Sequence, residues 1–225
     1  MRKALLAVVV LLAGCSAGPP AGGPSPSPVV TPAPTFLASA GCPVTDTDFC
    51  ARAIVAANAL LTGDPDALAS VVTVETFTCD EMPAGVVPAC RPGQVLAGLG
   101  VFAVATKISV VPTADYTGWL SDLLDRVDPG FTDERGPGRF AVLGVGTCGP
   151  DDPDRRSYHL SFTAALRGAG GQPAERWLGS LEFVRRDGKW GYALIYLDTV
   201  AAWRAEHSDP FRSLACGNVQ PWTVI

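Results

Sequence analysis

The feature that most constrains the fold is a pair of predicted strands joined by Asp187-Gly188. Residues Arg176–Arg185 and Trp190–Asp198 are rich in aromatic and aliphatic side chains, which is typical of β-strands. Asp-Gly between two such segments is typical of a two-residue hairpin turn, because both turn positions need a positive φ. We therefore expect an antiparallel hairpin within a sheet.

The remaining segments extend this prediction in both directions. We expect strands over Thr73–Thr78, within Gln94–Val111, and over Phe140–Thr147 and Ser157–Leu166. We expect four helices: Thr47–Leu61, a short one from the Asp64-Pro65 cap to Val72, Pro112–Val127, and Thr199–His207. In the third of these, Thr113 offers a cap. Helices first and antiparallel strands later predict an α+β domain.

Composition sets the domain boundaries. Ser16–Gly41 is rich in proline, glycine and serine, so neither a helix nor a strand ladder can form there. In polyproline II conformation it would reach up to ~80 Å. We interpret residues 15–41 as a spacer that begins with a lipidated cysteine, and residues 42–225 as a single globular domain. A chain of this length can bury one core.

The first fifteen residues have the layout of a bacterial lipoprotein signal peptide. Arg2 and Lys3 precede the apolar run Ala4–Leu12, which is too short to span a bilayer. Small residues then lead to Cys15, so we expect residues 1–14 to be removed and Cys15 to carry a diacylglyceryl group, with acyl chains such as palmitate. The alternative is an ordinary secretory signal cut further on. The predicted location is the extracytoplasmic face of the cell membrane in the bacterial envelope, with the bilayer as partner.

Six cysteines remain in the globular part. An even number in an exported domain predicts disulfide bonds. Spacing does not determine the pairing, and we expect neighbours to pair: Cys42 with Cys50, Cys79 with Cys90, and Cys148 with Cys216.

Charge and motifs argue against several classes of function. The net charge is −5 and no basic stripe is present, which argues against nucleic-acid binding. Gly144–Gly149 matches the dinucleotide fingerprint, but Pro150 follows where a helix must begin, so we expect no nucleotide. Asp151, Asp152 and Asp154 lack the spacing of a calcium loop. We expect no metal and no cofactor.

Six aromatic residues are candidates for lining a ligand pocket. Trp190, Tyr192 and Tyr196 share a phase on one predicted strand, and Trp177 lies on its partner. Tyr116 and Trp119 lie on one face of the predicted third helix. Aromatic side chains on a concave sheet line many ligand pockets. The alternative is that they form the core.

Two histidines are the candidates for acid–base chemistry. His159 alternates with the apolar residues of its strand, which predicts a solvent-facing side chain or, alternatively, the base of a pocket. His207 lies at a predicted helix end and is interpreted as structural, because a cation is favoured there.

The order of elements resembles the NTF2-like (SnoaL-type) cone fold. The matching pieces are the long opening helix, the second helix TGDPDALASVV and the hairpin SLEFVRRDGKWGYALIYL. The resemblance implies N-terminal helices packed on a curved antiparallel sheet, with a pocket. That family contains enzymes and binding modules, so the fold does not select a function.

The function that we expect is a lipid-anchored, noncatalytic binding or interaction module for an envelope protein or a small ligand. One alternative is a pocket enzyme of isomerase or dehydratase type, with His159 or an acidic residue as base. The other is an accessory domain for envelope assembly, for which a contiguous exposed apolar patch is expected.

Overall fold

The computed structural model describes residues 41–78, 91, 93–103, 107–150, 156–168, 172–202 and 219–222. All of these residues belong to one compact unit, Phe36–Ile225. The predicted signal peptide, Cys15 and nearly all of the spacer lie outside the described residues. So do His207, Asp151, Asp152, Asp154, Cys79, Cys90 and Cys216.

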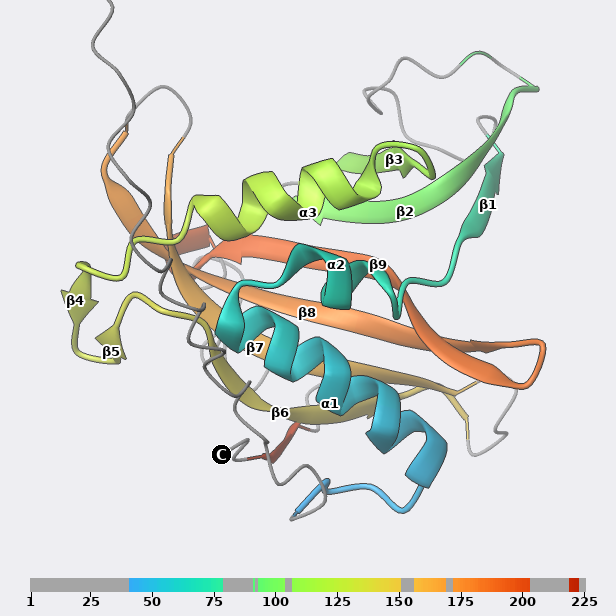
Figure 1. Ribbon diagram of the computed structural model, residues 1–225, viewed down its shortest axis with the longest axis horizontal. Coiled ribbons are helices and arrows are strands. Elements are labelled where there is room, and N and C mark those ends of the chain that lie inside the picture. Colours follow the sequence, from blue (N-terminus) through green and yellow to red (C-terminus); the bar gives the residue numbers. More distant parts are fainter. Residues whose placement is uncertain are drawn as a thin grey trace, which may run out of the picture. The chain divides into compact units, whose positions relative to one another are not determined.

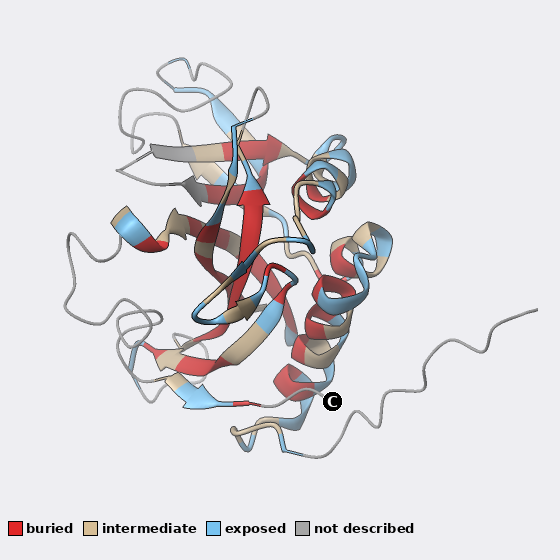
Figure 2. Ribbon diagram, turned by 90° about the vertical axis from the view of Figure 1, so that its left-hand side faces the viewer, coloured by how far each residue is buried: buried red, intermediate tan, exposed pale blue. Residues whose placement is uncertain are grey.

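Three helices cover one face of the main sheet (Figure 1). They are α1 (Thr47–Thr62), α2 (Pro65–Ala69) and α3 (Tyr116–Asp125). Asp46 caps α1 by accepting a hydrogen bond from the Phe49 amide at 2.9 Å, and Gly63 ends it with a φ of +72°. The buried sides of the helices face the sheet (Figure 2).

The main sheet is mostly antiparallel. In order across the sheet its strands are β1 (Glu75–Thr78), β2 (Val95–Ala103), β9 (Lys189–Thr199), β8 (Ala174–Arg186), β7 (Ser157–Arg167), β6 (Ala141–Cys148) and β10 (Val219–Pro221), with β3 (Lys107–Pro112) paired to β2. The β2–β9 pair is parallel. A separate hairpin is formed by β4 (Thr132–Asp133) and β5 (Gly136–Pro137).

The predicted α+β class, with N-terminal helices on an antiparallel sheet, is confirmed. The β8–β9 hairpin turns at Asp187 and Gly188, whose φ angles are +49° and +75°. The Cys42–Cys50 disulfide is present and holds the chain against the first turns of α1. Cys148 is also disulfide-bonded, and its expected partner Cys216 lies beyond the described part of the chain.

Several predicted boundaries are corrected. Gln94–Val111 is an antiparallel pair of strands, β2 and β3, where one strand region was expected. The second helix ends at Ala69, three residues early. The third begins at Tyr116, and Thr113 does not cap it, since the Thr113 hydroxyl donates to the Ala97 carbonyl oxygen on β2. The helix expected over Thr199–His207 begins one residue later, at Val200, and the described residues include it only to Ala202.

Among the described residues, the helices are too short or too polar to cross a bilayer.

Candidate functional site

Aromatic rings fill the space between α1 and the sheet. The Phe49 ring centroid lies 4.2 Å from that of Tyr158, 5.3 Å from that of Phe183 and 5.9 Å from that of Trp190. Phe49 and Phe183 have no exposed surface. Rings at these distances and angles form a packed interior.

Trp190 and Tyr192, two of the six predicted pocket aromatics, belong to this core. The Trp190 indole Nε1 donates to Asp46 Oδ2 at 3.1 Å, and the Tyr192 hydroxyl donates to the Leu68 carbonyl oxygen at 3.1 Å. Burial raises the pKa of the Tyr192 phenol well above its usual range, and nearby Tyr116 raises it further. Each polar tip is therefore occupied by a protein partner.

Tyr116, Trp119 and Trp177 pack against the edge of the same core and remain half-buried. Tyr116 and Trp119 come from α3, and Trp177 lies on β8 beside Ala164 of β7. The Trp177 Nε1 atom is buried and has no acceptor among the described residues. A buried unpaired donor is uncommon in a native fold and is the kind of group that a bound molecule satisfies.

A β-bulge separates Tyr196 from the other aromatics, so the predicted shared face is wrong. Glu182 pairs with Leu194 and Phe183 with Tyr192, which leaves Ala193 as the extra residue of β9. One extra residue inverts the side-chain alternation beyond it. Tyr196 therefore lies on the sheet face opposite to Trp190 and Tyr192.

On that opposite face, Tyr196 joins a polar cluster built from three adjacent strands. The Tyr196 hydroxyl donates to Glu182 Oε2 at 2.7 Å, and Glu182 Oε1 lies 3.8 Å from His159 Nε2. The His159 Nδ1 atom is 2.9 Å from Ser180 Oγ, and Nε2 is 3.4 Å from Ser157 Oγ. We call these five residues the His159 cluster.

His159 is only 7% exposed, so the prediction of a solvent-facing side chain is wrong. Burial lowers the pKa of His159, and the negative charge of Glu182 opposes that shift. Burial and the Glu182 carboxylate both raise the pKa of Tyr196. Burial thus favours the neutral form of the His159 imidazole, which lies between two serine hydroxyls and close to Glu182.

A histidine hydrogen-bonded to a serine and close to a carboxylate can act in proton transfer. A base of this kind must be accessible to its substrate. His159 is buried, and its hydrogen-bond partner Ser180 is only 1% exposed. Neither described cavity is lined by His159. The sequence predicts His159 as a candidate base but gives no role to Ser180, although its place two residues before Glu182 puts it on the same face.

The ion pair of Asp133 with Arg176 was not predicted from the sequence. Arg176 Nη2 donates to Asp133 Oδ1 at 2.8 Å and to the Gly136 carbonyl oxygen at 2.8 Å. Nε donates to Asp133 Oδ2, and Nη1 to the Pro137 carbonyl oxygen, both at 3.1 Å. These bonds tie the β4–β5 hairpin to β8, and the hydrogen bond from Arg176 lowers the pKa of Asp133.

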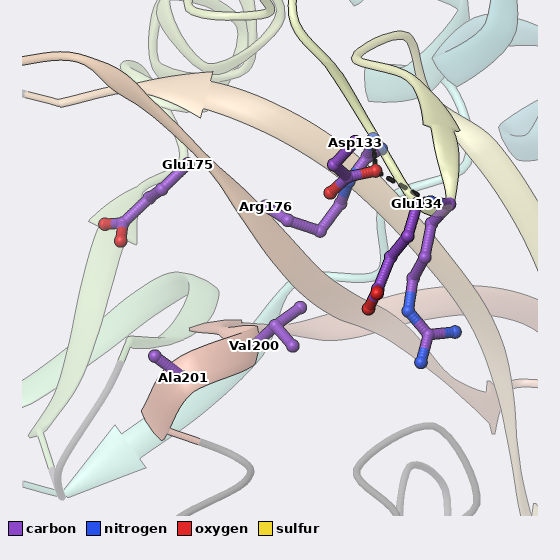
Figure 3. Close-up of a pocket in the computed structure, with 7 residues that line it drawn as sticks. Asp133, Glu134, Glu175, Arg176, Val200 and Ala201 are labelled. Carbon is purple, nitrogen blue, oxygen red and sulfur yellow. Dashed lines mark hydrogen bonds and ion pairs between the residues drawn. The ribbon is translucent and has the colours of Figure 1, made fainter.

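A cavity of about 370 Å³ lies beside this pair. In Figure 3, Asp133 and Arg176 point toward one another, Glu175 points away from them, and Val200 and Ala201 form the opposite wall. Because nearly every guanidinium N–H of Arg176 is already bonded to the hairpin, we assign this pair a structural role.

A larger hollow of about 700 Å³ runs along α1. Apart from the Thr47 hydroxyl, the side chains that line it are apolar or form the Cys42–Cys50 disulfide. Its lining is Gly41, Cys42, Val44, Thr47, Cys50, Ala51, Ile54 and Val55. We call this hollow the α1 groove.

In the part of the chain that the structure describes, no three histidine, cysteine, aspartate or glutamate side chains are grouped as metal ligands.

Comparison with known proteins gives similarity of structure alone. No protein-family model matches the sequence, and the search of curated proteins gave no match. A DUF4783 family protein from Bacteroides ovatus is 10% identical, with a TM-score of 0.39 over 65% of this chain and 93% of that one. A ketosteroid isomerase-like protein from Erwinia carotovora is 11% identical, with a TM-score of 0.39 over 68% and 95%.

A protein of the NTF2-like family from Streptomyces avermitilis is 13% identical, with a TM-score of 0.39 over 69% of this chain and 96% of that one. These neighbours include the family that the sequence resembles. At such identities and TM-scores they carry no argument about activity.

Proposed function

We propose that this chain is a lipid-anchored extracytoplasmic protein whose globular domain is a noncatalytic binding or interaction module. The anchor rests on the sequence: a basic start, a short apolar run, and small residues before Cys15. The Cys42–Cys50 disulfide supports an oxidising compartment, since structural disulfides are rare in the cytosol.

The observation that carries the noncatalytic assignment is the filled space between α1 and the sheet. An enzyme with a pocket on this face needs room for a substrate, and that room is taken by the Phe49, Tyr158, Phe183 and Trp190 rings. Hydrogen bonds to Asp46 and Leu68 occupy the polar tips of Trp190 and Tyr192. Binding would then use the outer surface of the domain.

An apolar probe tests this assignment. A packed interior excludes benzene, whereas a cavity left by truncating a large buried side chain takes it up. We expect benzene to raise the Tm of a Phe49→Ala variant and to leave the Tm of the unmodified protein unchanged. A benzene-dependent rise in the unmodified protein that Trp190→Leu abolishes would indicate an open pocket and contradict the assignment.

The alternative of a pocket enzyme is favoured by one observation, the buried His159 cluster. Its test is the reactivity of the imidazole toward diethyl pyrocarbonate, followed by peptide mass spectrometry. For a noncatalytic module we expect His159 to react far more slowly than free imidazole at pH 7. Fast modification, suppressed by a bound small molecule, would instead support the enzyme.

The third possibility, an accessory domain for envelope assembly, draws support from the α1 groove alone. It requires that another protein occupies the groove, and the experiment in the next subsection includes that outcome.

A further inference from the structure

The α1 groove lies where the chain joins the globular domain. Gly41, the first described residue, is itself part of its wall and has a φ of +103°, a conformation that favours glycine. The Cys42–Cys50 disulfide fixes this junction against the end of the first turn of α1. The spacer therefore approaches the domain beside an apolar hollow.

The α1 groove is continuous with an exposed aliphatic strip on α1. Val55 is 37% exposed, and Ile54 and Val44 are half-buried although all three are aliphatic. Ala51 and Val55 are four residues apart and so follow one another on a single side of the helix. An aliphatic strip that ends at the chain junction is suited to an apolar segment close in sequence.

The sequence supplies such a segment. Phe36 and Leu37 interrupt the proline-rich spacer just before Gly41. An extended chain spans at most about 3.3–3.6 Å per residue, so Leu37 can lie ~14 Å and Phe36 ~18 Å from Gly41. Val55 is ~8 Å along the helix axis from Cys50. Both side chains can therefore reach every part of the α1 groove.

We propose that Phe36 and Leu37 dock into the α1 groove, so that the end of the spacer is part of the folded domain. Chain connectivity favours this occupant over a separate molecule, since a segment a few residues away is present at a high effective concentration. The free spacer then shortens to residues 16–35, with a reach of ~60 Å in polyproline II conformation. The inference does not depend on lipidation of Cys15.

Methyl NMR of the complete mature protein in nanodiscs of deuterated lipid tests the docking. The isoleucines of the chain are Ile54, Ile108, Ile195 and Ile225, so an isoleucine δ1-methyl spectrum is simple to assign. We expect an intramolecular NOE between the Ile54 methyl group and the Phe36 ring. Absence of this NOE would overturn the proposal. So would an NOE from Ile54 to a different occupant of the groove: lipid chains in protonated nanodiscs, a second, differently labelled copy, or a co-purified protein.

A matched pair of variants gives a second readout. Phe36→Ser with Leu37→Ser removes the proposed occupant, whereas Val29→Ser with Val30→Ser removes an apolar pair farther from Gly41. We expect amide hydrogen exchange in the first two turns of α1 to become severalfold faster in the first variant only. Equal exchange in the two variants would contradict the docking.

Discussion

The carboxylate of Asp46 contacts both the helix that it caps and the indole of Trp190. One oxygen accepts from the Phe49 amide at 2.9 Å, and the other accepts from Trp190 Nε1 at 3.1 Å. Trp190 lies on β9, far along the chain from Asp46. A single side chain thus fixes the start of α1 against the last long strand of the sheet.

Replacing Asp46 should therefore destabilise the domain more than replacing an ordinary cap. We expect Asp46→Ala to lower the free energy of unfolding by about 2–3 kcal/mol, since both a cap and a hydrogen bond to a charged acceptor are lost. Asp64→Ala removes only the α2 cap, a bond of 2.9 Å to the Ala67 amide, and should lower it by about 1 kcal/mol. Equal losses in urea titrations would mean that the Trp190 bond contributes nothing.

The hydroxyl of Tyr192 gives a second stability prediction. Tyr192→Phe removes its buried bond to the Leu68 carbonyl oxygen, and we expect a loss of about 1 kcal/mol. Tyr158→Phe is the control, because the Tyr158 hydroxyl makes no hydrogen bond within the described residues; its effect should be smaller. Thermal unfolding of the three proteins measures the difference, and a larger effect at position 158 would contradict the assignment.

Stability should depend on pH through His159. Burial lowers its pKa in the folded protein below the usual value, so on acidification the unfolded chain takes up the proton first. The contribution of His159 to the free energy of unfolding is complete above the pKa of the unfolded chain, about 6.5. It is lost as the pH falls toward the pKa in the folded protein, and the free energy of unfolding changes by at most about 1.4 kcal/mol per pH unit.

Glutamine at position 159 cannot titrate, so His159→Gln should flatten the dependence between about pH 5 and 7. His207→Gln is the matched control and should retain the dependence. Urea titrations across this range measure both, and an unchanged slope in His159→Gln would show that another group is responsible.

Arg176 should hold the β4–β5 hairpin. Arg176→Met keeps the apolar stem but removes the bonds to Asp133, Gly136 and Pro137, which we expect to destabilise the protein by about 2 kcal/mol. Amide exchange around residues 132–138 should become faster, while exchange in α1 stays slow. Arg139→Met, at an exposed arginine two residues beyond the hairpin, controls for loss of charge and should have little effect on either measurement.

Most elements could be predicted because their patterns are local. The Asp187-Gly188 turn requires two positive φ angles, and this alone predicts the β8–β9 hairpin. The α1 boundaries follow equally from Asp46 and Gly63. These signals do not depend on the rest of the fold.

The His159 cluster and the Asp133–Arg176 pair could not be predicted as fully, because they depend on how the strands pair and on contacts between distant elements. The bulge at Ala193 reverses the face on which Tyr196 lies, and no local sequence signal marks it. The burial of His159 depends on its neighbours on β8 and β9, such as Ser180 and Tyr196, which alternation in one strand does not reveal. The Asp133–Arg176 pair joins residues from two separate elements, and pairing at that distance is invisible in a single sequence.

The central claim is that Cys15 anchors a folded extracytoplasmic domain to the membrane, and metabolic labelling with an alkyne-bearing palmitate tests it most directly. We expect the label on the N-terminal peptide that begins at Cys15, with the protein in the membrane fraction. The Cys15→Ala variant should be unlabelled and absent from the detergent phase. Unlabelled native protein that still begins at Met1 and fractionates with the cytosol would contradict the account.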